Sequence, residues 1–185
     1  RWMPDTGAAS SFDLMRVSQA IRAAAEQLRE TSDTARLDAE VLMAHALKAT
    51  RSELLLRHMA DAVPAAFFAL VARRAQHEPV AYITGEQDFY GLTFRVSSDV
   101  LIPRGDSEVL VERALAAKPD AARVLDCGTG SGALILSVIA NLPQAIGIGI
   151  DRSPEALGVA SANAADLGLA DRVQMTLADW TCDGW

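Results

Sequence analysis

Apolar residues recur every three or four positions through the first 78 residues, which is the spacing of a helix with one apolar face. In the first predicted helix these residues are Leu14, Val17, Ile21, Ala24, Ala25 and Leu28. A second helix is predicted over 34–48, and its apolar side is expected to hold Leu37, Val41, Ala44 and Leu47. This pattern indicates a small bundle of helices that pack together or recognise a partner.

Two shorter helices are predicted in the same region. Thr50 and Glu53 have the spacing of a capping box, in which each side chain accepts a hydrogen bond from the other residue's backbone N–H. Pro64 suits the first position of a following helix, where a missing N–H costs nothing. That helix is predicted to end before Pro79.

After these helices the period changes. The stretch 89–96, Phe-Tyr-Gly-Leu-Thr-Phe-Arg-Val, predicts a tight hairpin with its aromatic side chains facing a core and Gly91 near the turn. An extended connector is expected over 101–104. Asp106 can then cap a helix over 107–117. The inner side of this helix is expected to hold Val109, Leu110 and Leu115.

Beyond position 120, short apolar runs alternate with helical stretches. The runs predict strands at 124–125, 145–151 and 173–177, and the stretches between them predict helices at 133–141 and 154–167. Strands that alternate with helices form a parallel sheet through crossover connections. The predicted fold class is therefore α/β, with a Rossmann-like arrangement after the helical bundle.

Composition limits the possible partners. The chain has 185 residues, of which 50% are hydrophobic and 22% charged, so it can build a core for one or two domains. Its net charge of −7 offers no broad basic face, which argues against direct nucleic-acid binding. We find no apolar run long enough to span a bilayer and no signal-peptide pattern, so we expect no membrane association and a cytoplasmic protein.

Cysteine and histidine contribute little to the prediction. Cys127 and Cys182 are too few for a disulfide framework and lack the spacing of metal ligands. Cys127 is expected to be a small buried residue at the end of an inner strand. The three histidines, His45, His58 and His77, stand apart on predicted helices and receive no role.

The candidate chemistry lies at 124–132, Val-Leu-Asp-Cys-Gly-Thr-Gly-Ser-Gly. A strand here ends in Asp126 and leads through three glycines into a helix. Glycine lets the backbone turn tightly and lets a ligand approach, and the helix start would offer unpaired N–H groups. Asp151 closes the next strand 23 positions after Gly128, near the spacing expected for an acid that binds ribose hydroxyls.

Three details favour S-adenosylmethionine over a dinucleotide. The glycines are spaced G-x-G-x-G, whereas pyrophosphate binders use G-x-G-x-x-G. Asp126 would repel a pyrophosphate but would suit an aminoacyl or sulfonium group. Within 128–132 there is no arginine or lysine to neutralise phosphate. The turn together with Asp151 therefore predicts a class I methyltransferase.

Several strings in the chain resemble one family, the glutamine methyltransferases that modify peptide chain release factors (HemK/PrmC type). The most specific string is 101–108, Leu-Ile-Pro-Arg-Gly-Asp-Ser-Glu, which is similar to the family's I-P-R-P-D-T-E signature apart from Gly105 and Ser107. The other similar strings are 38–42, 78–85, 89–92, 125–132, 150–151 and 178–180. Together they cover nearly the whole chain in order.

The resemblance implies a set of cofactor-binding residues. The methionine portion and ribose of S-adenosylmethionine would be held by Gly128, Thr129, Gly130, Ser131 and Gly132. Asp151 would take the ribose hydroxyls, and Trp180 would stack on the adenine, with core packing as its alternative role. Asp179 is a candidate partner of the adenine amine. Arg104 is a candidate for ordering the pocket wall, with a surface salt bridge as the alternative.

The family also has an Asn-Pro-Pro-Tyr string that holds the glutamine amide, and this chain contains no such string. The 64 residues from Ala122 onward suffice for about three strands with their helices. We therefore expect a fragment of the enzyme, with no catalytic residue assigned and an open oligomeric state. Its expected parts are a helical substrate-recognition domain (1–83), a β-hairpin linker (84–104) and the N-terminal part of a methyltransferase domain (105–185).

Other functions stay open at this point. One is a different class I methyltransferase, acting on an adenine amine of nucleic acid or on another protein; the I-P-R connector and the acidic balance favour a release factor as the protein substrate. Another is a non-catalytic cofactor-binding or scaffold module. A third, an NAD-dependent dehydrogenase, is separable by thermal shift with S-adenosylhomocysteine and with NAD.

We predict that the purified 185-residue chain transfers little or no methyl group to a release factor. The groups that would orient the weakly nucleophilic amide nitrogen are missing from it. Incorporation of labelled methyl from S-adenosylmethionine into purified release factor measures this. Turnover on the order of 1–10 per second, ordinary for an enzyme, would contradict the prediction.

Overall fold

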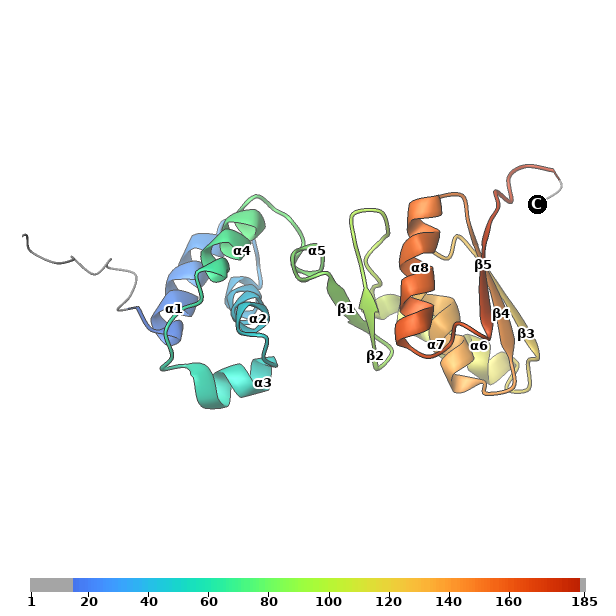
Figure 1. Cartoon of the computed structure of the whole chain (residues 1–185), viewed down its shortest axis with the longest axis horizontal. Helices are drawn as coiled ribbons and strands as arrows, with labels where there is room; N and C mark the ends of the chain where they lie inside the picture. The colour runs from blue at the N-terminus through green and yellow to red at the C-terminus, as the bar shows by residue number, and fades with distance from the viewer. Residues whose placement is uncertain (1–14, 184–185) are drawn as a thin grey trace, which may run out of the picture. The chain divides into compact units, whose positions relative to one another are not determined.

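Figure 1 shows the computed structural model of the chain, which describes residues 15–183. The chain divides into two compact units, the first ending at Thr84 and the second beginning at Gly85. Helices make up the first unit, and strands and helices alternate in the second. Among the described residues, no helix is long and apolar enough to cross a membrane.

The predicted helical bundle is confirmed. Its elements are α1 (Val17–Leu28), α2 (Ala35–Leu47), α3 (Arg51–Glu53), the π-helical turn η1 (Leu54–His58), α4 (Ala66–Ala75) and α5 (Val80–Thr84). The largest side chains buried in its core are Phe67, Ile21, Leu28, Leu42, Met43, Leu54 and Val17. The predicted first helix matches α1, except that Leu14 lies outside the described residues.

The capping box is also present. Thr50 Oγ1 accepts from the N–H of Glu53 at 3.2 Å, and Glu53 Oε2 accepts from the N–H of Thr50 at 2.9 Å. Pro64, however, does not open a helix: α4 begins at Ala66, and the carbonyl of Pro64 accepts from the N–H of Phe67 in the preceding turn.

The predicted apolar side of α2 is only partly right: Ala44 is buried and Leu47 packs partly buried against the core. Leu37 is 43% exposed, whereas Leu42 and Met43 are fully buried. Because α2 packs against α1, α4 and α5, its buried positions do not fall on one stripe. A helix with several neighbours loses the simple amphipathic pattern on which the prediction rested.

Two buried carboxylates tie α2 to its surroundings. Asp38 accepts from Ser32 Oγ at 2.7 Å and from Arg74 Nε of α4 at 2.7 Å. Glu40 accepts from Arg36 Nε at 2.6 Å and from Arg51 Nε at 2.8 Å. Burial raises the pKa of Glu40, but these two guanidinium groups outweigh that effect and hold the pKa below its ordinary value.

The second unit begins with the predicted hairpin, formed by β1 (Glu86–Phe89) and β2 (Leu92–Arg95). Tyr90 and Gly91 in its turn have φ of +51° and +73°, as a two-residue turn between antiparallel strands requires. Phe89 and Phe94 are buried and meet edge to face, which confirms the expected aromatic core contact.

A parallel sheet follows, as predicted, and its strands lie in the order β3-β4-β5. Its strands are β3 (Arg123–Cys127), β4 (Ile146–Asp151) and β5 (Val173–Leu177). The helices of this unit are the 3-10 turn η2 (Gly105–Ser107), α6 (Glu108–Ala117), α7 (Ala133–Asn141) and α8 (Pro154–Asp166). The unit is therefore α/β, with Rossmann-like crossover connections.

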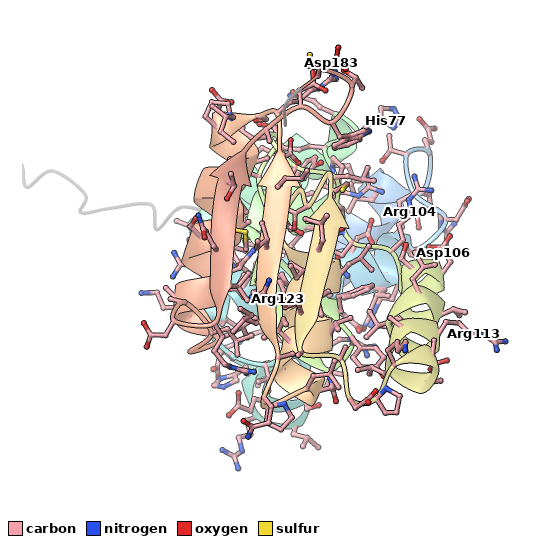
Figure 2. All side chains as sticks on the ribbon, turned by 90° about the vertical axis from the view of Figure 1, so that its right-hand side faces the viewer. His77, Arg104, Asp106, Arg113, Arg123 and Asp183 are labelled. Carbon is pink, nitrogen blue, oxygen red and sulfur yellow. The ribbon has the colours of Figure 1, made fainter. Side chains whose placement is uncertain are left out.

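The two faces of the sheet differ. On one face α7 packs so closely on β4 that a Cβ on Gly147 would lie 2.9 Å from Cδ1 of Ile135. On the other face Leu125, Ile146 and Ile148 are 53%, 49% and 44% exposed. Figure 2 shows this second face toward the viewer, with no helix in front of the three strands.

Three predictions fail in this unit, the third of them only in part. Cys127 is exposed, because it lies two positions after Leu125 on β3 and therefore on the same open face of the sheet. Asp106 does not cap α6, since it sits inside η2 and accepts from Ser107 Oγ instead. The expected inner side of α6 is only partly right: Leu115 packs partly buried against the core, whereas Val109 and Leu110 are 51% and 59% exposed. The fully buried residue of this helix is Val111.

We predict that Glu40→Gln lowers the free energy of unfolding at pH 7 by about 1–2 kcal/mol, since it removes a buried charge from two half-exposed arginines. A lowered pKa means that this stability is fully present above the ordinary pKa of 4.5 and is lost as the pH falls through the lowered value. Urea unfolding at pH 7 and at stepwise lower pH measures the difference between the two proteins.

The matched control is Glu26→Gln, which removes an exposed carboxylate from its pair with Arg29. We expect no measurable change, because exposed pairs contribute little. A loss in Glu40→Gln that does not shrink at any pH as the medium is made more acidic would mean that shape, and not charge, is responsible.

Candidate cofactor site

The glycine turn, residues 128–132, connects β3 to α7 and is anchored on the end of β4. The N–H groups of Gly128 and Thr129 both donate to the carbonyl of Ile150, at 2.8 and 2.9 Å. Gly128, Gly130 and Gly132 have φ of +81°, +54° and +80°. This left-handed backbone explains why glycine stands at these three positions.

Asp151, the last residue of β4, faces this turn. Its Oδ2 accepts from the N–H of Gly130 at 2.9 Å, and its Oδ1 accepts from the N–H of Ser153 at 3.0 Å. The carboxylate is therefore held in place between the glycine turn and the start of α8. Each oxygen keeps a second lone-pair direction that a ligand hydroxyl can use.

The other two residues of the turn point inward. Thr129 and Ser131 are 6% and 3% exposed, and Thr129 Oγ1 donates to Asp126 Oδ2 at 2.8 Å. The Thr129 side chain fits because Gly149 lies beneath it: a Cβ on Gly149 would lie 2.9 Å from Thr129 Oγ1. The buried side chains of both residues therefore support the turn from the protein interior. Only their backbone atoms lie on the exposed surface of the turn.

Most N–H groups of the glycine turn are already paired, so the unpaired N–H groups expected at the helix start do not extend into the turn. Gly128, Thr129 and Gly130 donate to the end of β4, and the N–H of Gly132 donates to the carbonyl of Thr129 at 2.8 Å. What the turn presents to a ligand is the Asp151 carboxylate and the bare surface of its glycines.

Asp126 adds a second carboxylate to the same place. Burial raises the pKa of Asp126, and the charge of Asp151 raises it further, while hydrogen bonds from Thr129 and from the backbone of Ile135 act in the opposite direction. Two carboxylates at one turn make a negative potential that a cationic group relieves and a pyrophosphate would worsen. The residues present therefore fit the ammonium and sulfonium groups of S-adenosylmethionine.

Trp180 approaches the turn from the segment after β5. A Cβ on Gly128 would lie 3.0 Å from Cη2 of its indole, and the side chain is 44% exposed. An aromatic face therefore stands next to the first glycine of the turn. The neighbouring Asp179 closes its own turn, because its Oδ1 accepts from the N–H of Thr181 at 2.9 Å and from its hydroxyl at 2.6 Å.

Arg104 lies on the exposed connector between β2 and α6, near Asp106 (Figure 2). Among residues 15–183 no salt bridge involves it, so the alternative role as a surface ion pair gains no support.

Sequence reasoning missed two residues that shape the site. Ser153 caps α8 through a 3.1 Å hydrogen bond from the N–H of Ala156, and its own N–H binds Asp151. The Ser-Pro-Glu string at 153–155 is a recognisable helix start and could have revealed it. Asn163 contacts the carbonyl of Ser131 at 2.8 Å. The sequence signal that could have revealed Asn163 was a polar residue on a helix face made of small apolar residues.

A parallel sheet that presents a glycine turn and an acid at the ends of adjacent strands defines the cofactor half of a class I methyltransferase. Residues 19–85 match the PrmC N-terminal domain and residues 118–182 match a methyltransferase domain. Over most of its length the chain is similar to release factor glutamine methyltransferases.

The relatives show how much of the family's length is present. The release factor glutamine methyltransferase of Cereibacter sphaeroides is 44% identical over 171 residues, which cover 90% of this chain and 60% of that protein. The one from Moorella thermoacetica is 45% identical over 150 residues, 78% of this chain and 53% of that protein. The chain thus spans between half and two thirds of the length of these relatives.

A solved structure overlaps a smaller part of the chain. The S-adenosyl-L-homocysteine complex of a methyltransferase from Geobacter sulfurreducens is 35% identical, covers 37% of this chain and 28% of its own, and has a TM-score of 0.34.

We predict that Asp126→Asn raises the melting temperature of the ligand-free protein at pH 7. A raised pKa means that the ionised side chain is less favourable in the folded than in the unfolded protein, so the neutral amide removes a cost. The gain should shrink as the pH falls through the raised pKa, because wild-type Asp126 then takes up a proton.

Thermal unfolding at several pH values measures the effect, with the exposed Asp120→Asn as the matched control. The Thr129 hydroxyl can reverse its hydrogen bond and accept from the new amide. A lower melting temperature for Asp126→Asn at pH 7 would contradict the argument.

Proposed function

We propose that this chain is the helical and cofactor-binding part of an enzyme that methylates the side-chain amide nitrogen of a glutamine in a peptide chain release factor, with S-adenosylmethionine as methyl donor. The observation that carries the proposal is the pair of carboxylates, Asp126 and Asp151, at one glycine turn. Similarity to release factor glutamine methyltransferases supports the choice of substrate.

Each site residue has a stated role in this proposal. When bound, S-adenosylmethionine supplies a methyl group activated by the sulfonium charge. Asp151, held by Gly130 and Ser153, accepts hydrogen bonds from the two ribose hydroxyls. Asp126 offsets the positive charge of the methionine portion. Trp180 offers its exposed indole face to the adenine.

The turn itself contributes its surface. The backbone of Gly128, Thr129, Gly130, Ser131 and Gly132 lines the methionine portion and ribose, since the side chains of Thr129 and Ser131 are buried beneath it. The Oδ2 of Asp179 is left over from that residue's own turn, and we assign it to the adenine amine.

The helical unit is proposed to recognise the protein substrate. Its buried acids, Asp38 and Glu40, are engaged with arginines inside the unit, so its outer surface is what a release factor would meet. The net charge of −7 favours a protein over a direct nucleic-acid partner. An enzyme acting on release factors would work where translation terminates, in the cytoplasm.

We predict that S-adenosylhomocysteine binds the 185-residue chain and that Asp151→Asn weakens this binding by about 10- to 100-fold. The substitution replaces charged acceptors of the ribose hydroxyls by one neutral acceptor and a donor. Isothermal titration calorimetry measures the dissociation constants.

The matched control is Asp171→Asn, which neutralises an exposed acid just before the amino end of β5. This position is at the opposite end of the parallel strands from Asp151. It should bind as the wild type does. Titration with NAD tests the dehydrogenase alternative. Binding of NAD in place of S-adenosylhomocysteine, or equal affinities in both variants, would refute the assignment of this pocket.

A further inference from the structure

Asn163 is a buried polar residue outside the glycine turn. Asn163 is 1% exposed, and it lies on the buried face of α8 together with Ala156, Ala160 and Ala164. An amide on such a face is costly to bury unless its donors and acceptor are all paired.

The side chain of Asn163 meets this requirement with three backbone groups. Its Oδ1 accepts from the N–H of Arg95 at 2.7 Å, and its Nδ2 donates to the carbonyl of Arg95 at 3.0 Å. The same Nδ2 donates to the carbonyl of Ser131 at 2.8 Å. The amide can take only this orientation, because a flip would set NH₂ against an N–H and oxygen against two carbonyls.

The side chain of Asn163 thus connects Arg95, at the end of β2, with Ser131 in the glycine turn. The Ser131 carbonyl belongs to the peptide that enters Gly132, and it lies between two glycines whose φ is positive. Glycine restricts backbone rotation least, so this peptide depends on outside contacts to keep one orientation. Beside it, Gly130 donates the hydrogen bond that holds Asp151.

We infer that Asn163 is a positioning residue for cofactor binding, which fixes the glycine turn by holding the Ser131 carbonyl and couples that turn to the hairpin through Arg95. This inference rests on the proposed function. Asn163 touches no ligand in this scheme; it acts through Ser131 and Gly130 on the geometry of Asp151. The exposed Arg95–Asp166 ion pair also joins the hairpin to α8, but it does not reach the turn.

The test compares Asn163→Ala with Asp166→Ala in the 185-residue chain, by calorimetric titration with S-adenosylhomocysteine at a temperature where both variants are folded. Both substitutions weaken the contact between α8 and the hairpin, and only the first releases the Ser131 carbonyl. We expect the dissociation constant to rise about tenfold in Asn163→Ala and to stay within about twofold in Asp166→Ala. A purely structural role would lower melting temperatures and leave both dissociation constants unchanged.

The outcomes separate the two proposals. A wild-type chain that does not bind S-adenosylhomocysteine would overturn the proposed function and this inference with it. A wild type that binds, together with an Asn163→Ala variant of equal affinity, would overturn this inference alone.

A second measurement covers the case in which Asn163→Ala does not fold. Hydrogen exchange of the wild-type chain should become slower at the Arg95 amide when S-adenosylhomocysteine binds, because that amide donates to Asn163. Unchanged exchange at Arg95 in the bound protein would overturn the coupling.

Discussion

The carboxyl end of β4 is the point on which the rest of the site depends. Two N–H groups of the glycine turn donate to the carbonyl of Ile150, and a third donates to the carboxylate of Asp151. The same carboxylate also accepts from the N–H of Ser153, the residue that caps α8. The turn, the strand and the start of α8 are therefore fixed by two adjacent residues, and the parallel register between β3 and β4 brings Asp126 to the same place.

This arrangement concentrates negative charge before any ligand is bound. Asp126 is ionised less readily than an ordinary aspartate, because it is buried and because Asp151 lies near it. Sites that bind charged ligands often carry such unfavourable groups, whose cost the ligand removes. Positioning falls to neutral groups: Thr129, Ser153 and Asn163 hold the acids and the turn by hydrogen bonds without adding charge.

Sequence patterns predicted most elements of the second unit. The limits of α7 and β5, the hairpin turn at Tyr90-Gly91 and the parallel sheet follow from local rules: two-residue hairpins need positive φ, and short apolar runs between helices form parallel strands. The errors concern burial. Leu37, Val109 and Leu110 are apolar but exposed, and Cys127 follows the open face of β3. Periodicity marks a face of a helix or strand without saying which neighbour covers it.

The sequence by itself determined the α/β order of elements, the glycine turn and the two acids at the ends of adjacent strands, because glycine spacing and strand ends are local properties of the chain. Only the tertiary structure decided which groups those acids bind. The tertiary structure also decided the partners of Asn163. This residue lies 32 positions from Ser131 and 68 from Arg95, so no local pattern indicates its hydrogen bonds to them. Three N–H groups of the glycine turn bind β4 and so do not face a ligand, since a strand packed beside the turn offers its carbonyl and carboxylate first.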